Sequence, residues 1–297
     1  MRVLVSGVSG PIGKALLPSL RAVGCQVTRL VRNPSSDSGQ IQWNPVEPLG
    51  PERVSGFDAV IHLAGETIVG RWTAAKRKSI QDSRVLGTRN LAQALARTQT
   101  KPKVFISGSA IGFYGDRADE ILLEDSAPGL GFLAEVCQEW EAATRPAAES
   151  GIRVAQFRTG IVLSKQGGAL EKMLTPFRLG LGGRLGSGRQ WWSWIHVQDW
   201  VGACHHILKS DLLAGPINGV APAPVTNLDF TKTLGAALHR PTIFPAPAFA
   251  LRLALGSGAA NEMLLASQRV EPARLVASGY PFQFKDLTQA LRDIIGR

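Results

Sequence analysis

Cysteine is scarce in this chain of 297 residues, and its three copies, Cys25, Cys137 and Cys204, lie far apart. Without a CxxC pair or a cluster of histidines, neither a disulfide framework nor a metal site is indicated. The sequence also lacks an apolar run of roughly 18 residues, the length that spans a membrane. Gly7 interrupts the N-terminal stretch before it resembles a signal peptide. We therefore expect a cytoplasmic protein that has no metal site and does not enter a membrane.

Acidic residues are outnumbered, because 33 lysines and arginines face 23 aspartates and glutamates, giving a net charge of +10. A positive charge favours polyanions and phosphate-bearing small molecules as partners. The densest basic run, RWTAAKRK (71–78), has no aromatic stacking motif and no recognition-helix pattern beside it. We interpret it as a solvated helix face, which leaves a small-molecule substrate as the expected partner and no nucleic acid.

Short β-branched runs alternate with longer helical patterns in the first half of the chain. The pattern predicts strands over 1–7, 26–31, 58–65, 103–110 and 153–160, and helices over 16–24, 83–97 and 133–151. This alternation is typical of an α/β Rossmann fold, a doubly wound parallel sheet. It predicts an NAD(P)-binding domain over 1–163, to which a later strand near 216–222 returns. Residues 164–297 are expected to form a smaller, mostly helical substrate-side region, with a C-terminal helical segment over about 245–295.

The segment GVSGPIG (7–13) directly follows the first predicted strand and opens the first helix. A pyrophosphate needs close approach to the backbone and free N–H groups at a helix N-terminus, and glycines at this spacing supply both. The prediction is a dinucleotide site built from Gly7, Ser9, Gly10, Pro11, Ile12 and Gly13. The alternative is that the glycines serve tight packing alone.

The end of the second predicted strand, RLVRNP (29–34), indicates which dinucleotide the site prefers. NAD sites usually place an acidic residue here, about 20 residues past the glycines, to bind the ribose hydroxyl. This stretch contains no acid but does contain Arg32, and a guanidinium pairs well with a 2′-phosphate. NADP(H) is therefore favoured over NAD(H), with Arg29 as a second candidate for the same role. An exposed Arg32 without a ligand is the alternative.

Several motifs follow one another in a fixed order: GVSGPIG, DAVIHLAGE (58–66), SGSAIGFYG (107–115), RTGIVL (158–163) and WIHVQD (194–199). Together they resemble the extended short-chain dehydrogenase/reductases of the NAD-dependent epimerase/dehydratase type. The stretches 176–196 and 264–284 look like an atypical subgroup, the epimerase family proteins, which has its own C-terminal segment. The resemblance covers essentially the whole chain and implies an NADP(H)-binding oxidoreductase or epimerase. Its substrate is expected to be a nucleotide-sugar-like or other small hydroxyl or carbonyl compound.

The resemblance implies roles for individual residues. Leu63, Ala64 and Gly65 match the loop after the fourth strand, which passes the adenosine and pyrophosphate of the cofactor. Ser109 matches a serine that hydrogen-bonds substrate, and Arg158 a strand-end residue beside the nicotinamide. At the position of a family asparagine stands Arg84, whose guanidinium is expected either to reach the cofactor phosphates or to form a structural salt bridge. Relatives often pair through the helices flanking the fourth and fifth strands, so a homodimer is one expectation.

A tyrosine with a lysine four residues later is what active members of this superfamily use to move the substrate proton. Matching GFLAEVCQEWE (131–141) to that helix puts Phe132 and Val136 at the two positions. The chain has two tyrosines, Tyr114 and Tyr280, and neither has a lysine four residues later. The ordinary tyrosine–lysine mechanism is therefore excluded in any alignment.

Four other residues are candidates for the missing acid or base: Tyr114, which in relatives shapes the pocket, Glu66, Glu135 and His196. A carboxylate at 135 cannot imitate an ammonium, and a histidine in WIHVQD more often has a structural role. The catalytic residues predicted are Ser109, which the resemblance implies, and Tyr114 as a substitute acid. An alternative function is a non-catalytic NADP(H)-binding sensor or scaffold protein.

Three tryptophans, Trp191, Trp192 and Trp194, fall within four positions after a glycine-rich loop. They are expected either to line a pocket that stacks on a base or sugar or to fill the core of the second region, or to be divided between the two.

Overall fold

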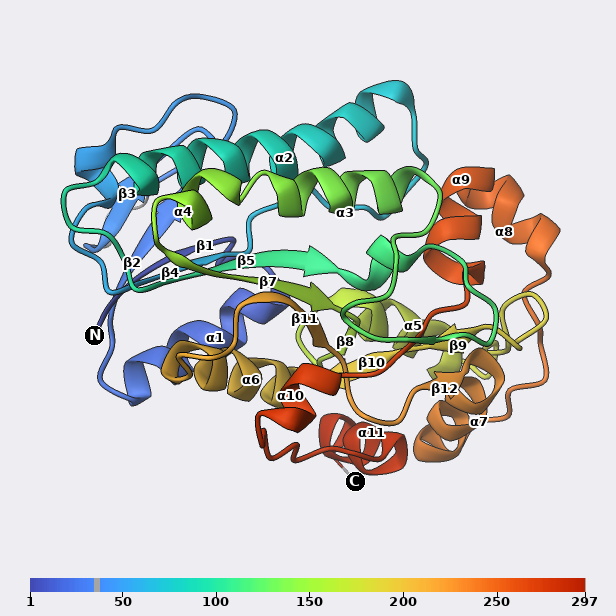
Figure 1. Cartoon of the computed structure of the whole chain (residues 1–297). Helices are drawn as coiled ribbons and strands as arrows, with labels where there is room; N and C mark the ends of the chain where they lie inside the picture. The colour runs from blue at the N-terminus through green and yellow to red at the C-terminus, as the bar shows by residue number, and fades with distance from the viewer. Residues whose placement is uncertain (35–37, 297) are drawn as a thin grey trace.

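The structure, a computed structural model, describes residues 1–34 and 38–296. Within these residues a seven-stranded sheet has the order β11-β7-β5-β4-β1-β2-β3, and its pairings are parallel (Figure 1). Its strands are β1 (Arg2–Ser6), β2 (Gln26–Val31), β3 (Gln40–Gln42), β4 (Ala59–His62), β5 (Val104–Ala110), β7 (Arg153–Thr159) and β11 (Gly215–Gly219). The strand order reverses beside β1, and ligands of such sheets bind at the carboxyl ends of the strands at this switch point.

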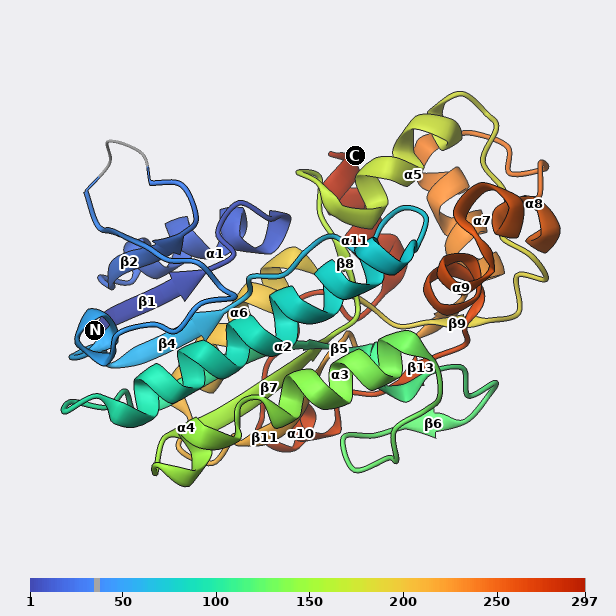
Figure 2. The ribbon, with the colours of Figure 1, turned by 90° about the horizontal axis from the view of Figure 1, so that it is seen from above.

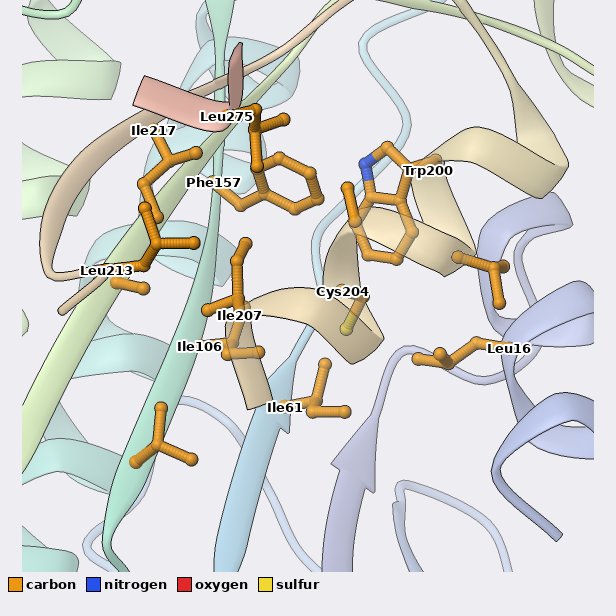
Figure 3. Packing of buried hydrophobic residues seen from close by; sticks show 14 of the residues in the cluster. Leu16, Ile61, Ile106, Phe157, Trp200, Cys204, Ile207, Leu213, Ile217 and Leu275 are labelled. Carbon is orange, nitrogen blue, oxygen red and sulfur yellow. The ribbon is translucent and has the colours of Figure 1, made fainter. Parts of the chain in front are cut away.

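Helices cover both faces of the sheet. One face carries α1 (Pro11–Ala22) and α6 (Val197–Lys209), and the other carries α2 (Ala74–Arg97), α3 (Phe132–Ala142) and α4 (Arg145–Glu149), with α2 and α3 side by side in Figure 2. Figure 3 shows the core between the sheet and α6. There, apolar side chains of β4, β5 and β7 meet those of α6, namely Ile61, Ile106, Phe157, Trp200, Cys204 and Ile207.

A smaller region lies mostly beyond the carboxyl ends of the strands, although its short helix over 273–277 packs against β11. It contains α5 (Gly168–Arg178), α7 (Asn227–Leu238), α8 (Ala248–Leu255), α9 (Ser257–Ala260), the π-helical turn Asn261–Leu265, α10 (Ala273–Ala277) and α11 (Leu287–Ile295). Two-stranded pairs complete it: β8 (Ile161–Leu163) with β10 (Trp194–His196), β9 (Trp191–Trp192) with β12 (Val225–Thr226), and β6 (Ile121–Leu122) with β13 (Arg269–Val270). Two 3₁₀ turns, Pro51–Val54 and Ile111–Tyr114, lie in the first half of the chain.

The predicted doubly wound parallel sheet with a smaller helical C-terminal region is confirmed. The later strand also returns, as β11 beside β7. A domain boundary at 163/164 stays a prediction, because α6 and β11 follow it in sequence and yet pack against or within the sheet.

The structure differs from the predicted elements in three places. The helix expected over 83–97 begins nine residues earlier, at Ala74, where the Thr73 hydroxyl accepts a hydrogen bond from the Lys76 N–H. The helix expected over 133–151 is divided into α3 and α4 at Ala143–Thr144. The short β3 was not predicted.

The described part of the chain contains neither a membrane-spanning helix nor a cluster of metal-binding side chains. No helix there is long and apolar enough to cross a membrane. Nor do three or more histidines, cysteines or carboxylates gather in a group able to hold a metal ion.

Candidate functional site

A cavity of about 830 Å³ opens at the carboxyl ends of β1, β2 and β4. Its walls come from the glycine turn after β1, the end of β2, the loop after β4, a loop before the 3₁₀ turn at 51–54, and one face of α2. The lining residues are Gly7–Gly10, Leu30–Asn33, Trp43–Val46, Leu63–Glu66, Ala75, Lys78, Ser79, Asp82 and Ser83. This is the switch point of the sheet.

The glycines of the turn serve different purposes. Gly7 has φ +73, and a Cβ there would collide with the Leu63 carbonyl carbon, while a Cβ on Gly13 would collide with Val8. Both are therefore required by the packing of the chain itself. Gly10 has φ −74, and the nearest atom to a Cβ there is 3.7 Å away. Because Gly10 lines the cavity, its missing side chain leaves room for a ligand rather than for the protein.

The N-terminus of α1 can receive an anion. Its N-cap is Gly10, which offers no side-chain hydrogen bond, Pro11 occupies the first turn, and that turn contains no acidic residue. The backbone N–H groups of Ile12 and Gly13 fall in that first turn, which also carries the positive end of the helix dipole. The turn from Gly7 to Gly13 thus matches the requirements of a pyrophosphate.

Arg32 follows β2 and lines the cavity together with Asn33. Arg29 lies within β2, in register with Gln40 of β3, and is not among the lining residues. Of the two arginines predicted for a 2′-phosphate, Arg32 is the one placed at the cavity.

The loop after β4 forms the opposite wall through Leu63, Ala64, Gly65 and Glu66. The Glu66 N–H donates to Ser83 Oγ at 2.9 Å, and Lys76 Nζ lies 2.7 Å from Glu66 Oε1. The hydrogen bond from Lys76 lowers the pKa of Glu66, against the effect of burial, so this carboxylate is anionic at neutral pH.

Arg84 extends from α2 behind that loop. Its Nη1 donates to the carbonyl oxygens of Glu66 at 2.9 Å and Ile80 at 3.3 Å, and its Cζ lies 5.2 Å from the centre of the Trp140 ring. Arg84 forms no salt bridge with any of the described residues, although a structural salt bridge was one of the two expectations for it.

Ser109, Tyr114 and Arg158 meet in a buried polar network that is centred on Glu141 of α3. The Ser109 hydroxyl donates to Glu141 Oε1 at 2.6 Å, and Arg158 binds both carboxylate oxygens of Glu141 at 2.8 Å. Arg158 Nη1 also donates to Tyr114 Oη at 2.9 Å and to the Glu124 carbonyl oxygen at 3.0 Å. The sequence predicted Ser109 and Tyr114 as catalytic and Arg158 as a residue beside the nicotinamide, and it did not indicate Glu141.

Tyr114 is fully buried. Its hydroxyl lies 2.7 Å from Asn218 Oδ1 and 3.0 Å from the Leu123 carbonyl oxygen, either of which accepts its proton. Burial raises the pKa of Tyr114, despite the opposing charge and hydrogen bond of Arg158. Neither Ser109, Tyr114 nor Arg158 lines the 830 Å³ cavity.

The family of this chain follows from comparison with known proteins. Residues 3–218, which include the cavity and the network, match the model of the NAD dependent epimerase/dehydratase family. The chain belongs to this family. Residues 246–294 match a second model, a domain of unknown function that covers the segment from α8 to α11.

Relatives of the epimerase family span the full length of this member. It is 42% identical over 291 residues to the epimerase family protein Mb2239 of Mycobacterium bovis, covering 97% of this chain and 96% of that protein. It is 39% identical over 299 residues to the human epimerase family protein SDR39U1, covering 99% and 100%.

Solved structures of the family agree with the fold. The human SDR39U1 (isoform 2) crystal structure with NADPH has a TM-score of 0.92, 37% identity and full coverage of both chains. A nucleoside-diphosphate sugar epimerase from Corynebacterium glutamicum has a TM-score of 0.84 and 38% identity, covering all of this chain and 58% of that one.

The helix at which epimerase-family enzymes are expected to carry tyrosine and lysine is α3. Phe132 is half-buried, with its ring centre 5.2 Å from that of Trp72, and Val136 is buried, whereas Glu135 is exposed. The N-cap, Gly131, has no side chain, but Glu262 from the π-helical turn accepts a hydrogen bond from the Leu133 N–H at 2.8 Å. The C-terminal segment thus completes the start of this helix.

His196 and the tryptophans of this family member are mainly structural. The Nδ1 of His196 accepts the Gln198 N–H at the start of α6, its Nε2 lies 3.3 Å from Asp293 Oδ2, and burial lowers its pKa. Trp192 and Trp194 belong to the core around α7 and α11. Only Trp191 lies apart from that core, half-buried with Arg269 Cζ 4.4 Å from its ring centre.

Sequence reasoning missed part of the cavity. The lining residues of α2 form two pairs at a spacing of four, Lys78 with Asp82 and Ser79 with Ser83. This spacing is equally typical of a solvated helix face. Asn44 belongs to an irregular loop, where periodicity gives no signal.

Proposed function

We propose that this chain binds NADP(H) along the carboxyl ends of β2, β1 and β4 as an epimerase-family oxidoreductase. The observation that carries the proposal is the open space at Gly10, beside a helix N-terminus without acidic residues. Gly7, Ser9, Gly10, Pro11, Ile12 and Gly13 would hold the pyrophosphate, and Leu63, Ala64 and Gly65 would line its other side. The human relative crystallised with NADPH supports this assignment.

The preference for NADP(H) over NAD(H) is assigned to Arg32. A guanidinium at the end of β2 can pair with a 2′-phosphate, and this segment provides no acidic residue for a free 2′-hydroxyl. Bound NADPH supplies the hydride, so the protein has to orient the cofactor and handle the proton.

The substrate is proposed to be a small molecule with a hydroxyl or carbonyl group, of the nucleotide-sugar type. A solved relative at 38% identity is described as a nucleoside-diphosphate sugar epimerase, which supports this class. The catalytic roles of Ser109 and Tyr114, pairing into a homodimer and a cytoplasmic location stay predictions.

A non-catalytic NADP(H) sensor or scaffold is the second candidate. It is favoured by the network around Glu141, in which the hydroxyls of Ser109 and Tyr114 already donate to protein acceptors. A donor that is engaged in this way, with a raised pKa at Tyr114, is poorly placed to protonate a substrate.

Calorimetric titration with NADPH and NADH tests the proposal. Arg32→Ala should weaken NADPH binding by about 1.5–3 kcal/mol, roughly 10- to 150-fold, because it removes a hydrogen bond to a charged group, and should leave NADH nearly unchanged. Arg21→Ala, an exposed arginine in the last turn of α1, is the control. An equal loss for both cofactors would refute the 2′-phosphate assignment.

An assay of NADPH consumption distinguishes the two candidate functions. A catalytic protein consumes bound NADPH with some member of a panel of carbonyl compounds, and Tyr114→Phe abolishes that reaction if the phenol is the acid. Tight binding of NADPH without turnover across the panel would support the sensor or scaffold.

A further inference from the structure

Arg84 of α2 occupies an enclosed position between the cavity loop at Gly65 and α3. A Cβ on Gly65 would lie 3.2 Å from Arg84 Cζ and 3.4 Å from both Nη atoms, so the guanidinium lies directly against the backbone of the cavity loop. On its other side is the ring of Trp140 in α3. Gly65 thus lacks a side chain where the guanidinium needs the space, and the guanidinium is held in one orientation.

Only part of the guanidinium is used by the protein. Nη1 donates to two carbonyl oxygens, whereas Nη2 and Nε make no hydrogen bond to any residue of 1–34 or 38–296. Neither atom is among the fully buried polar atoms that lack a partner, so both retain access to solvent. Because burial lowers the pKa of Arg84, an additional acceptor for this cation is favourable.

The sheet order places Arg84 and Arg32 on opposite sides of the pyrophosphate turn. That turn follows β1, and Arg32 follows β2 on one side. Gly65 follows β4 on the other side, and Trp140 lies over β5, where a Cβ on Gly108 would be 3.0 Å from its ring. A dinucleotide that crosses the switch point with its adenosine near β2 directs its second nucleoside toward β4 and β5.

The neighbouring part of α3 provides no positive charge of its own. The buried residues there are Val136, Cys137 and Trp140, and burial raises the pKa of the Cys137 thiol to about 12, so it is neutral. Arg84 is therefore the cation that α2 brings to the part of α3 around Cys137 and Trp140, whereas Arg77 of α2 lies over Phe132 at the start of α3.

We propose that Arg84 orients the nicotinamide half of NADP(H), with its free N–H groups donating to the hydroxyl oxygens of the nicotinamide-side ribose. It thereby supplies from α2 the positive charge that Val136 cannot supply from α3. The inference rests on the proposed function and differs from the expectation that Arg84 reaches the cofactor phosphates.

Two ligands distinguish the two ends of the site. NADPH contains both nucleosides, whereas 2′,5′-ADP retains adenine, the 2′-phosphate and the first phosphate of the pyrophosphate but lacks the nicotinamide side. Both are titrated calorimetrically into the wild type and into Arg84→Ala, Arg84→Lys, Arg32→Ala and Arg89→Ala. Arg89 is an exposed arginine of the same helix and serves as the matched control.

Arg84→Ala should raise the Kd of NADPH about 10- to 150-fold, the range for hydrogen bonds from a charged group, and leave the Kd of 2′,5′-ADP within about twofold. Unchanged 2′,5′-ADP binding also shows that the variant is folded. Arg84→Lys should fall between wild type and Arg84→Ala for NADPH. The emission of bound NADPH should change in Arg84→Ala, because the nicotinamide is held differently, and should stay unchanged in Arg89→Ala.

Other results overturn the inference. An equal loss for both ligands means that Arg84 acts on the adenosine side or only supports the loop, and an unchanged NADPH affinity means that it makes no cofactor contact. In either case a weaker 2′,5′-ADP affinity in Arg32→Ala leaves the proposed function standing. If the wild type binds neither ligand, the proposed function itself fails.

Discussion

The ion pair between Glu141 and Arg158 gives the sharpest test of how the buried network supports the fold. The two side chains are 12% and 4% exposed, so solvent screens their interaction little. Glu141→Ala removes the carboxylate and leaves the Arg158 guanidinium buried without its counter-charge. Breaking a buried pair in this way costs about 3–5 kcal/mol. Ser109 also loses the acceptor of its hydroxyl, which places the expected loss toward the upper end of that range.

Chemical denaturation followed by tryptophan fluorescence and by circular dichroism measures the effect as a change in the free energy of unfolding. Glu139→Ala is the control, because Glu139 is exposed on the same helix and accepts one hydrogen bond from Gln81. It should change stability by less than about 0.5 kcal/mol. Glu141→Gln keeps the shape of the side chain and should lie between the two. A loss below about 1 kcal/mol in Glu141→Ala would refute the view that this pair holds β5, β7 and α3 together.

Two further predictions concern the glycine turn and the protonation of a buried histidine. Gly10→Ala should change the free energy of unfolding by less than about 0.5 kcal/mol and weaken NADPH binding at least about tenfold. Gly7→Ala should destabilise the protein by more than about 1 kcal/mol. The reverse pattern would contradict the assignment of Gly10 to the ligand. Burial lowers the pKa of His62 from 6.5 to about 4, so its contribution is complete above pH 6.5 and is lost as the pH falls toward 4, because the unfolded chain binds the proton first. Denaturation at pH 7 and pH 5 measures how much stability each protein loses between the two pH values. This loss should be about 2 kcal/mol smaller in His62→Gln than in the wild type, and an equal loss in the two proteins would contradict the neutral buried state of His62.

Local sequence patterns were sufficient for the sheet and the glycine turn. The strands β1, β4, β5 and β7 are largely buried runs with flanking turns, and the turn from Gly7 to Gly13 is defined by residues within one short segment. The first turns of α2 were missed for the opposite reason. Its buried residues begin only at Ile80, so the segment before it has no apolar periodicity to detect.

The partners of the candidate residues depend on tertiary packing and were beyond sequence reasoning. Glu141 is 32 residues from Ser109 and 17 from Arg158, and nothing in its own neighbourhood marks it as their common acceptor. For Arg84 the sequence indicated a cation near the cofactor, but the direction of its guanidinium is decided by Trp140 and by the empty side of Gly65.

The cap that Glu262 provides for α3 has a consequence for synthesis on the ribosome. The two bonded residues, Leu133 and Glu262, are 129 positions apart, and translation adds about 5–20 residues each second. The first turn of α3 is therefore made about 6–26 s before the carboxylate that caps it. Throughout that interval this end of α3 lacks the carboxylate that caps it, and whatever part of the sheet forms by then forms beside an uncapped helix.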